Sequence, residues 1–338
     1  MNHFMRTGAL CCGLLATADP AFALEPIPTK DGFSGYLNVG GGSITGKSNM
    51  IAGSAIGDIG HRTISSLTDK PKSKSDAIPT INGELQYTFA SSRTQLFFGN
   101  QLEDFIEFDF STLLGVRHEL SDKSIVAASF TFSALPTEVW KDPYLTNQKR
   151  SKTDRDSTGI QLEWDKISGT GFRAKYIYRN IEIDDELSGT SLGLSTGDIK
   201  LLERDGSSQN VELSYQFNFN NGHLLRPILK YRKQDLDGRA MRHDAWSLAL
   251  NHIYATAKYT FVTNIEFARA DFDKENPIYG KTLDYDTWGA SLVAAYKNPF
   301  GAKKWSLLAT AAYFDQGSNI DFYNTTLTYF GLSALYRF

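Results

Sequence analysis

Apolar and polar residues alternate along most of this chain, in segments that are separated by polar links. In one such segment, Ile81, Leu85 and Phe89 fall in the apolar phase, and Glu84 and Gln86 fall in the polar phase. Residues i and i+2 of a β-strand point to the same side, so each segment predicts a strand with one apolar and one polar face. The pattern therefore predicts an all-β protein.

The same alternation recurs in residues 106–111, 160–165, 210–219 and 258–267. The alternating runs extend over about 9 to 13 residues, which is the length that a strand needs to cross a membrane. Strands of a soluble β-sandwich are about half as long and pack both inner faces into a dry core. The run length therefore favours membrane-crossing strands.

The links between these segments alternate in length. Residues 121–123, 168–170 and 220–222 form short links, and the Asn-Asn-Gly of the last one suits a tight turn because Asn and Gly tolerate positive φ. Long polar links lie between the short ones, at residues 42–78, 136–157, 183–208, 235–243, 271–284 and 315–325. We predict a single transmembrane antiparallel up-and-down β-barrel of about 14 strands, with about 12 or about 16 as alternatives, short periplasmic turns and long extracellular loops.

The last segment, LTYFGLSALYRF, places Phe330, Leu332, Tyr336 and Phe338 on one strand face. It resembles the closing strand of Gram-negative outer-membrane β-barrels, which serves as their insertion signal. The resemblance implies a location in the cell outer membrane. It also implies outer-membrane lipid, lipopolysaccharide and the barrel-assembly machinery as partners, with Phe338 and Tyr336 as the membrane-assembly signal.

The first residues predict an export signal over 1–23. Arg6 supplies a positive flank, residues 8–16 an apolar run, and Ala21-Phe22-Ala23 a cleavage site, which leaves residues 24–338 as the barrel. Both cysteines, Cys11 and Cys12, fall inside this signal. We therefore expect a mature chain without disulfides and without a cysteine metal site, exported through the periplasm.

Composition excludes two classes of protein. The net charge of −3 and the pI of about 6.1 offer no basic patch for nucleic acid. Past the export signal, no apolar run approaches the roughly 18 residues of a membrane helix. An aromatic content of 13% with 28 glycines suits a membrane barrel with aromatic girdles.

Four segments carry a closer resemblance. They are GFSGYLNVGGG (residues 32–42), TEVWKDPYLTNQ (137–148), TDRDS (153–157) and IDDELSG (183–189). Together they resemble an uncharacterised family of Gram-negative outer-membrane β-barrel proteins that is classed as a domain of unknown function. The resemblance implies the barrel and its location, and it carries no activity.

Charged residues on the polar strand faces are the candidates for lining a pore. The basic ones fall on two strands, as Arg173, Lys175 and Arg179, and as Arg226, Lys230 and Arg232. The acidic ones are Glu84, Glu107, Asp109, Glu163, Asp165 and Glu212. A basic wall opposed by acidic residues would create a transverse field that filters ions. In the alternative, the charges pair with one another and keep the lumen wet.

The loop at residues 136–157 is third in order and carries Trp140 and Tyr144. Many general porins fold this loop into the pore. Here it lacks their acidic glycine-rich signature, so we predict a surface loop, with inward folding as the alternative. Carboxylate clusters such as Asp184, Asp185 and Glu186 could bind Ca²⁺, but none has the full calcium-loop spacing, and we predict solvated loops without a metal.

Two histidines on the long-loop side have an acidic neighbour. His61 is close to Asp58, and His243 precedes Asp244. Adjacent residues of a strand point to opposite faces, and no serine nucleophile is placed by the sequence. We therefore predict no catalytic residue, no cofactor and no enzyme activity.

The leading functional hypothesis is a porin-like passive channel for small hydrophilic solutes, because a barrel of this size holds water and its lining is charged or amidic. The second is a structural or partner-binding barrel whose lumen is closed by residues 42–78, which carry Met50, Ile51, Ile56, Ile59 and Ile64. The third is a hydrolase of lipids or peptides at the rim. The sequence specifies neither the solute nor the oligomeric state.

Overall fold

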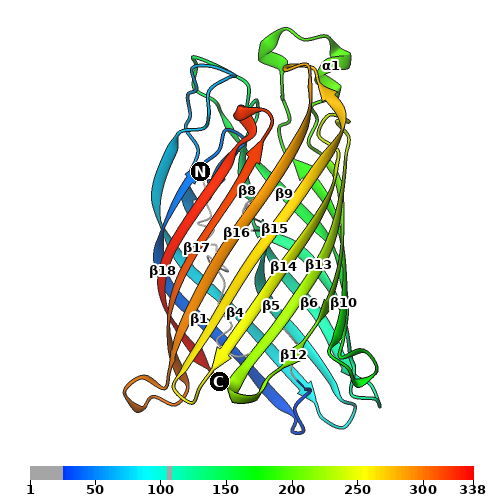
Figure 1. The fold of residues 1–338 in the computed structure, drawn as a ribbon, viewed down its shortest axis with the longest axis vertical. Helices are drawn as coiled ribbons and strands as arrows, with labels where there is room; N and C mark the ends of the chain where they lie inside the picture. The colour runs from blue at the N-terminus through cyan, green and yellow to red at the C-terminus, as the bar shows by residue number, and fades with distance from the viewer. Residues whose placement is uncertain (1–25, 105–108) are drawn as a thin grey trace, which may run out of the picture.

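The computed structural model of the protein describes residues 26–104 and 109–338, and side chains outside residues 101–110. Fourteen long strands form one closed antiparallel barrel, which confirms the predicted fold and strand number (Figure 1). The predicted export signal and the candidate lining residue Glu107 lie outside the described residues, as does the side chain of Asp109.

The barrel strands are β1 (Gly32–Lys47), β4 (Ser73–Phe89), β5 (Thr94–Asp104), β6 (Asp109–Glu119), β7 (Ile125–Leu135), β9 (Lys152–Asp165), β10 (Phe172–Ile183), β11 (Gly206–Tyr215), β13 (His223–Leu236), β14 (His243–Ala255), β15 (Tyr259–Asn276), β16 (Lys281–Lys297), β17 (Trp305–Ser318) and β18 (Thr325–Arg337). Short strands lie in the links or extend a barrel strand, as β2 (Ile51–Ser54), β3 (Gly57–Asp58), β8 (Thr137–Trp140) and β12 (Phe217–Asn218). The helical turns are α1 (Thr196–Lys200), η1 (Ile167–Gly169), η2 (Thr190–Leu192), η3 (Asn220–Gly222), η4 (Pro299–Gly301) and η5 (Asp321–Tyr323).

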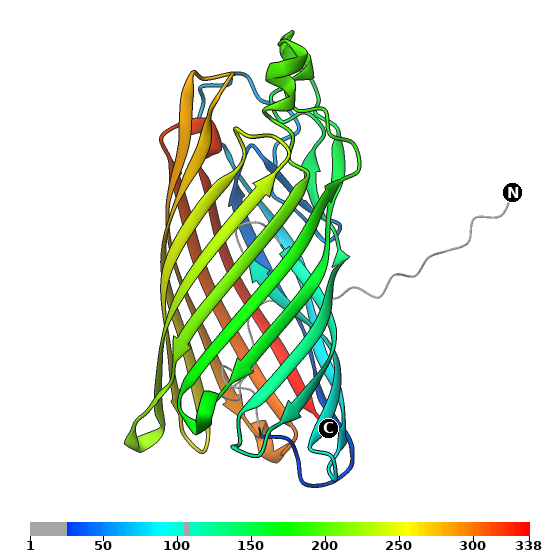
Figure 2. The same ribbon diagram turned by 90° about the vertical axis from the view of Figure 1, so that its right-hand side faces the viewer.

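The first and last strands close the barrel. β1 pairs with β18 from Tyr36↔Arg337 to Lys47↔Thr326, and with β4 on its other side. Closure leaves no open sheet edge, which a membrane requires because lipid offers no hydrogen bonds to unpaired backbone groups. Long links lie at one end of the barrel and short turns at the other, as predicted (Figures 1 and 2).

The outward face of the barrel is apolar. Leu248, Phe267 and Leu332 are 64%, 60% and 71% exposed although all three are strand residues. Aromatic pairs mark both rims of this belt, with Trp246 against Tyr231 towards the long links and Trp305 against Tyr336 towards the short turns. Exposed apolar strands between two aromatic girdles are typical of a surface that faces lipid. No helix among the described residues is long and apolar enough to cross a membrane.

Glycines make room where β18 meets β1. The Tyr329 side chain of β18 crosses the inward face of β1, and its hydroxyl lies 2.8 Å from Thr80 Oγ1 on β4. A Cβ at Gly42 would lie 2.7 Å from the Tyr329 ring, and a Cβ at Gly331 would lie 2.0 Å from its hydroxyl. Part of the glycine-rich opening at residues 32–42 is therefore explained by this close approach.

Candidate pore and its outer cap

A cavity of about 900 Å³ occupies the interior of the barrel. Arg337 and Phe338 line its periplasmic end, and Met50, Ile51 and Tyr323 line it beneath the extracellular links. This volume is in the range of cavities that hold small-molecule ligands. The interior is therefore hollow rather than filled by side chains.

Charges alternate across four neighbouring strands in this cavity. Glu163 on β9 is the cross-strand partner of Lys175 on β10, which in turn faces Glu212 on β11. Glu212 faces Lys230 on β13, and the Lys230 Nζ donates to both carboxylate oxygens of Glu266 at 3.1 Å. Directly opposed unlike charges stabilise a sheet, so the strand register itself holds this row in place.

Two arginines extend the row. Arg173 Nε lies 2.8 Å from Glu163 Oε1, and Arg117 donates to the two oxygens of Glu84 at 2.9 and 3.0 Å. We call these residues the charged belt, which consists of four carboxylates and four cations: Glu84, Glu163, Glu212, Glu266, Arg117, Arg173, Lys175 and Lys230. The belt is balanced in charge. Carboxylates thus alternate with the predicted basic wall instead of opposing it across the lumen.

Seven of the twelve predicted lining residues line the cavity. They are Glu84, Glu163, Arg173, Lys175, Glu212, Lys230 and Arg232. Asp165, Arg179 and Arg226 are buried but are not part of the described cavity wall. Arg226 donates to Gln216, and Arg179 lies 3.5 Å from both Ser157 Oγ and Thr131 Oγ1.

The sequence analysis missed Arg117 and Glu266. Both face inward on strands whose apolar and polar residues alternate, so the alternation that identified the other lining residues would also identify these two.

Small residues lie beside the charged belt. The inward positions of β14 and β16 that line the cavity include Ala245, Ser247, Ala249, Gly289 and Ser291. Short side chains here leave space that longer ones would fill. Ser247 is the cross-strand partner of Lys230, and Ala249 is that of Glu266, so small side chains on β14 lie between the charged side chains of β13 and β15.

Three extracellular links close the outer end of the barrel. We call residues 48–72, 136–151 and 184–205 the outer cap. They belong to the first, third and fourth links, because the connection between β5 and β6 counts as the second. Within it, β2 pairs with β8 in the register Ile51↔Val139, so the first and third links share a short sheet. Ile59 is fully buried against inward-facing side chains of the wall, among them Ile44, Ile78 and Leu327. The apolar side chains of the first link are thus packed inside the barrel.

The prediction that the third link stays at the surface is wrong. Trp140 and Tyr144 are fully buried, and Thr137 and Val139 line the cavity. The link folds inward without an acidic glycine-rich signature. Its β8 strand adds to β2, and its arginine at position 150 binds the first link.

Arg150 joins the first and third links. Its guanidinium donates to the backbone oxygens of Asn49 at 2.7 Å, Pro143 at 2.9 Å and His61 at 2.5 Å, and lies 4.2 Å from the Trp140 ring centre. Burial lowers the pKa of Arg150 to about 10, so it remains charged at neutral pH. One buried cation thus holds three carbonyl groups from two distant segments.

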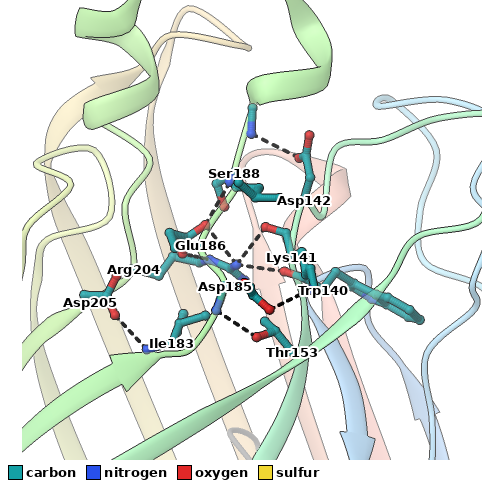
Figure 3. Close-up of polar contacts among 12 residues, drawn as sticks. Trp140, Lys141, Asp142, Thr153, Ile183, Asp185, Glu186, Ser188, Arg204 and Asp205 are labelled. Atoms are coloured by element: carbon teal, nitrogen blue, oxygen red, sulfur yellow. Dashed lines mark hydrogen bonds and ion pairs between the residues drawn. The ribbon is translucent and has the colours of Figure 1, made fainter.

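Arg204 joins the third and fourth links (Figure 3). It donates to the Trp140 oxygen at 2.8 Å, and its Nε donates to Glu186 at 2.7 Å. In the same region, Asp142 accepts the backbone N–H groups of Gly189 and Ser191 at 3.0 Å each. The expectation of solvated acidic loops is therefore wrong for Glu186, which is bound to an arginine.

Asp58 fixes the β2–β3 hairpin to the wall. Its carboxylate accepts from Lys74 Nζ at 2.9 Å and from Lys152, which also binds Glu138. Burial alone would raise the pKa of Asp58, but hydrogen bonds from Lys152 and Lys74 outweigh it and lower that pKa. Asp58 is therefore an ion-pair anchor of the cap rather than a partner of a catalytic histidine.

An apolar cluster forms the centre of the closure. It includes the fully buried Tyr144, Leu202, Phe322 and Tyr323. The Tyr144 and Tyr323 hydroxyls lie 2.6 Å apart, and Asn276 Nδ2 donates to Tyr323 at 2.7 Å. Burial raises the pKa of Tyr323 to about 12, so the hydroxyl stays neutral. Packed side chains thus separate the cavity from the extracellular side.

The candidate histidines do not form acid–base pairs. His243 lines the cavity and lies 4.4 Å from the Phe272 ring, whereas the Asp244 carboxylate accepts from Tyr231 on the outward face. His61 Nε2 contacts the Ser73 oxygen at 3.0 Å, and Asp58 binds lysines. In the described part of the chain, no three His, Cys, Asp or Glu residues are arranged to hold a metal.

The closed barrel, the lipid-facing belt and the hollow polar interior define a channel-like β-barrel protein of the outer membrane. A family model described as "Protein of unknown function (DUF2860)" matches residues 32–337. The chain therefore belongs to this family, and the resemblance read from the four sequence segments is confirmed. A comparison with curated proteins found no match.

Several solved structures are similar to the chain. A FadL homologue of Pseudomonas aeruginosa is 15% identical with a TM-score of 0.47, over 96% of this chain and 96% of that one. The COG4313 outer membrane channel of Pseudomonas putida F1 is 6% identical with a TM-score of 0.45, over 96% and 100% of the two chains. The outer membrane channel DcaP of Acinetobacter baumannii is 11% identical with a TM-score of 0.43, over 97% and 100%.

Proposed function

We propose that this protein is a passive outer-membrane channel for small hydrophilic solutes. The observation that carries the proposal is the cavity of about 900 Å³, which extends from Phe338 to the underside of the outer cap and is crossed by the charged belt. A charged lining keeps a lumen wet and lets hydrated solutes pass by diffusion. The function needs neither a cofactor nor an energy source.

The outer cap makes this channel closed at rest. Solutes reach the cavity from outside only when the first and third links move away from the wall. The links are held by an apolar cluster and by polar anchors, chiefly Arg150, Arg204 and Asp58. Segments held in this way open locally at a free energy below that of global unfolding. Diffusion would therefore occur during such openings.

A second candidate follows from the same packing. The burial of Ile59, Trp140 and Tyr144 supports a barrel that stays closed and serves a structural or partner-binding role. The two candidates differ in one property, which is whether ions ever pass through the purified protein. Measuring ion passage with the cap locked and then released distinguishes the two candidate functions.

The chain offers a site for such a lock. A Cβ at Gly57 of the β3 strand would lie 3.7 Å from the Cβ of Ile78 on the barrel wall, which suits a disulfide. The predicted mature chain is free of cysteine, so a Gly57→Cys, Ile78→Cys pair would have only one way to pair. The single variants serve as controls.

Planar-bilayer recording of the full-length protein tests the proposal. The wild type and the reduced double variant are expected to show discrete conductance steps, and the oxidised double variant is expected to be silent. Equal conductance in the oxidised and reduced forms would refute gating by the first link. Silence of folded wild type and of the reduced variant alike would refute the channel and support the closed barrel.

A further inference from the structure

Arginine side chains line the outer half of the cavity. Arg232 lies two residues beyond Lys230 towards the extracellular end of β13, and Arg155 lies near the extracellular end of β9. The fourth link adds Arg204, which is bound to Glu186. All carboxylates among the described cavity-lining residues belong to the charged belt. Guanidinium groups are therefore the charged groups among the described residues that line the cavity above the belt.

An amide lies beside this positive charge. Gln234 follows Arg232 on the same inward face, is only 6% exposed, and lines the cavity. Its Oε1 has no hydrogen-bond partner among the described residues. A buried amide oxygen without a partner is costly, and the side-chain amide can turn to present its NH₂ group instead. Arg232 itself is oriented by donating through Nε to Asn210 Oδ1 at 3.0 Å.

The same region has apolar surfaces. Met50, Leu236, Met241 and Phe272 line the cavity beneath the cap. Methionine side chains adapt to ligands of irregular shape, and an aromatic ring offers a flat contact surface. Ala245 on β14 is the cross-strand partner of Arg232, and its side chain is too small to fill the space beside the guanidinium. Cationic groups, a buried amide and apolar surfaces thus meet in one enclosed volume.

We propose that the outer half of the cavity is a binding site for an organic anion with a compact apolar body, of the arylalkanoate class. The carboxylate would lie against Arg232 and the Gln234 amide, and the apolar body against Met241 and Phe272. Charge-assisted hydrogen bonds give the anion its preference, and burial of the body adds affinity. The inference rests on the proposed channel function, because the site lies on the path of the solute.

A matched series of probes tests the chemistry. Calorimetry on the full-length protein in detergent would compare 4-phenylbutyrate with its neutral amide, with 4-phenylbutylammonium and with butyrate. We expect saturable binding of 4-phenylbutyrate, and affinities lower by about tenfold or more for the other three, since each lacks the charge, has the wrong charge or lacks the ring. Equal affinity for the anion and the ammonium compound would overturn the proposal.

Substitutions locate the site. Arg232→Gln is expected to weaken 4-phenylbutyrate binding by about tenfold or more, and Gln234→Ala by a smaller factor. Lys233→Gln is the control, because it removes one positive charge from the same strand at an exposed position on the outward face. Arg155→Gln is a second test if the Arg232 variant does not fold. An effect of Lys233→Gln as large as that of Arg232→Gln would refute this site.

Binding and conduction are measured separately, so their failures can be distinguished. Saturable, Arg232-dependent binding by a protein that never conducts would support the site and refute the channel. A protein that conducts ions but binds all four probes with the same affinity would support the channel and refute the site.

Discussion

Replacing Arg150 by Met is expected to loosen the outer cap without unfolding the barrel. The change removes three hydrogen bonds to the carbonyl groups of Asn49, Pro143 and His61, and the stacking on Trp140. It keeps most of the side-chain volume. Both ends of this contact belong to the links, so the strand ladder of the wall is unchanged.

The magnitude follows from these contacts. A hydrogen bond that involves a charged group contributes about 1.5 to 3 kcal/mol, and each of the three buried carbonyl groups left without its donor costs about 1 to 3 kcal/mol. Removal of the charge also ends its desolvation cost, so we expect a net loss near the lower bound, about 3 kcal/mol. Since every 1.4 kcal/mol corresponds to about tenfold in an equilibrium constant, the cap should open on the order of 100-fold more often.

Hydrogen exchange measures this opening directly. The backbone N–H of Asn147 donates to Ile64, and that of Ile59 donates to Ala52, so both report on the cap. Their exchange should accelerate on the order of 100-fold in Arg150→Met, while the strand amides of the wall keep their rates. In a planar bilayer, the variant should conduct more often than the wild type.

The control is Arg62→Met. Arg62 has an exposed side chain, and it contributes to the cap only through its backbone oxygen, which accepts from the Arg150 N–H and is retained in the variant. Unchanged exchange in Arg150→Met, or equal acceleration in both variants, would show that the guanidinium does not hold the cap.

Three further predictions concern the Asp58 anchor, the contact between β1 and β18, and assembly in the membrane. The folded-state pKa of Asp58 is lowered, so its contribution is complete above the unfolded value of about 3.9 and is lost as the pH falls through the folded value. Exchange of the β2–β3 amides should therefore accelerate in that acidic range, and in Asp58→Asn at neutral pH. Gly42→Ala should destabilise the barrel by about 1 to 3 kcal/mol because the new Cβ would clash with Tyr329. Gly41→Ala is the control and should not destabilise it, because its Cβ would contact only a carbonyl oxygen at 3.6 Å. Heat-dependent gel mobility measures the difference in stability. Deletion of Phe338 should reduce the fraction of chains assembled in the outer membrane, and normal assembly of that variant would count against its role as a signal.

The fold could be predicted from the sequence because one periodicity determines it. The alternation predicts that Ile160, Leu162 and Trp164 face lipid. All three are exposed on the barrel. The same parity identified most of the cavity-lining charges. Pairing of these charges was one of the two alternatives, but which residues pair was not predicted, because it depends on register between strands, as for Glu212 and Lys230.

The outer cap could not be predicted in detail. Arg150 binds the oxygen of Asn49, a residue 101 positions earlier in the chain. No local sequence pattern predicts such a contact, since the position of a loop depends on a distant segment against which it packs. The spaced isoleucines identified the first link as a possible closure, whereas inward folding of the third link was only the alternative to the surface position that we predicted.

The contact of the first link with the last strand sets an order of events during biogenesis. Ile59 packs against Leu327 and against Tyr329 of β18, so its docking site is incomplete until the carboxyl-terminal strand has joined β1. The first link is synthesised among the earliest parts of the chain, yet Ile59 can complete its packing only after the latest part arrives. Burial of Ile59 therefore reports that β18 has joined β1.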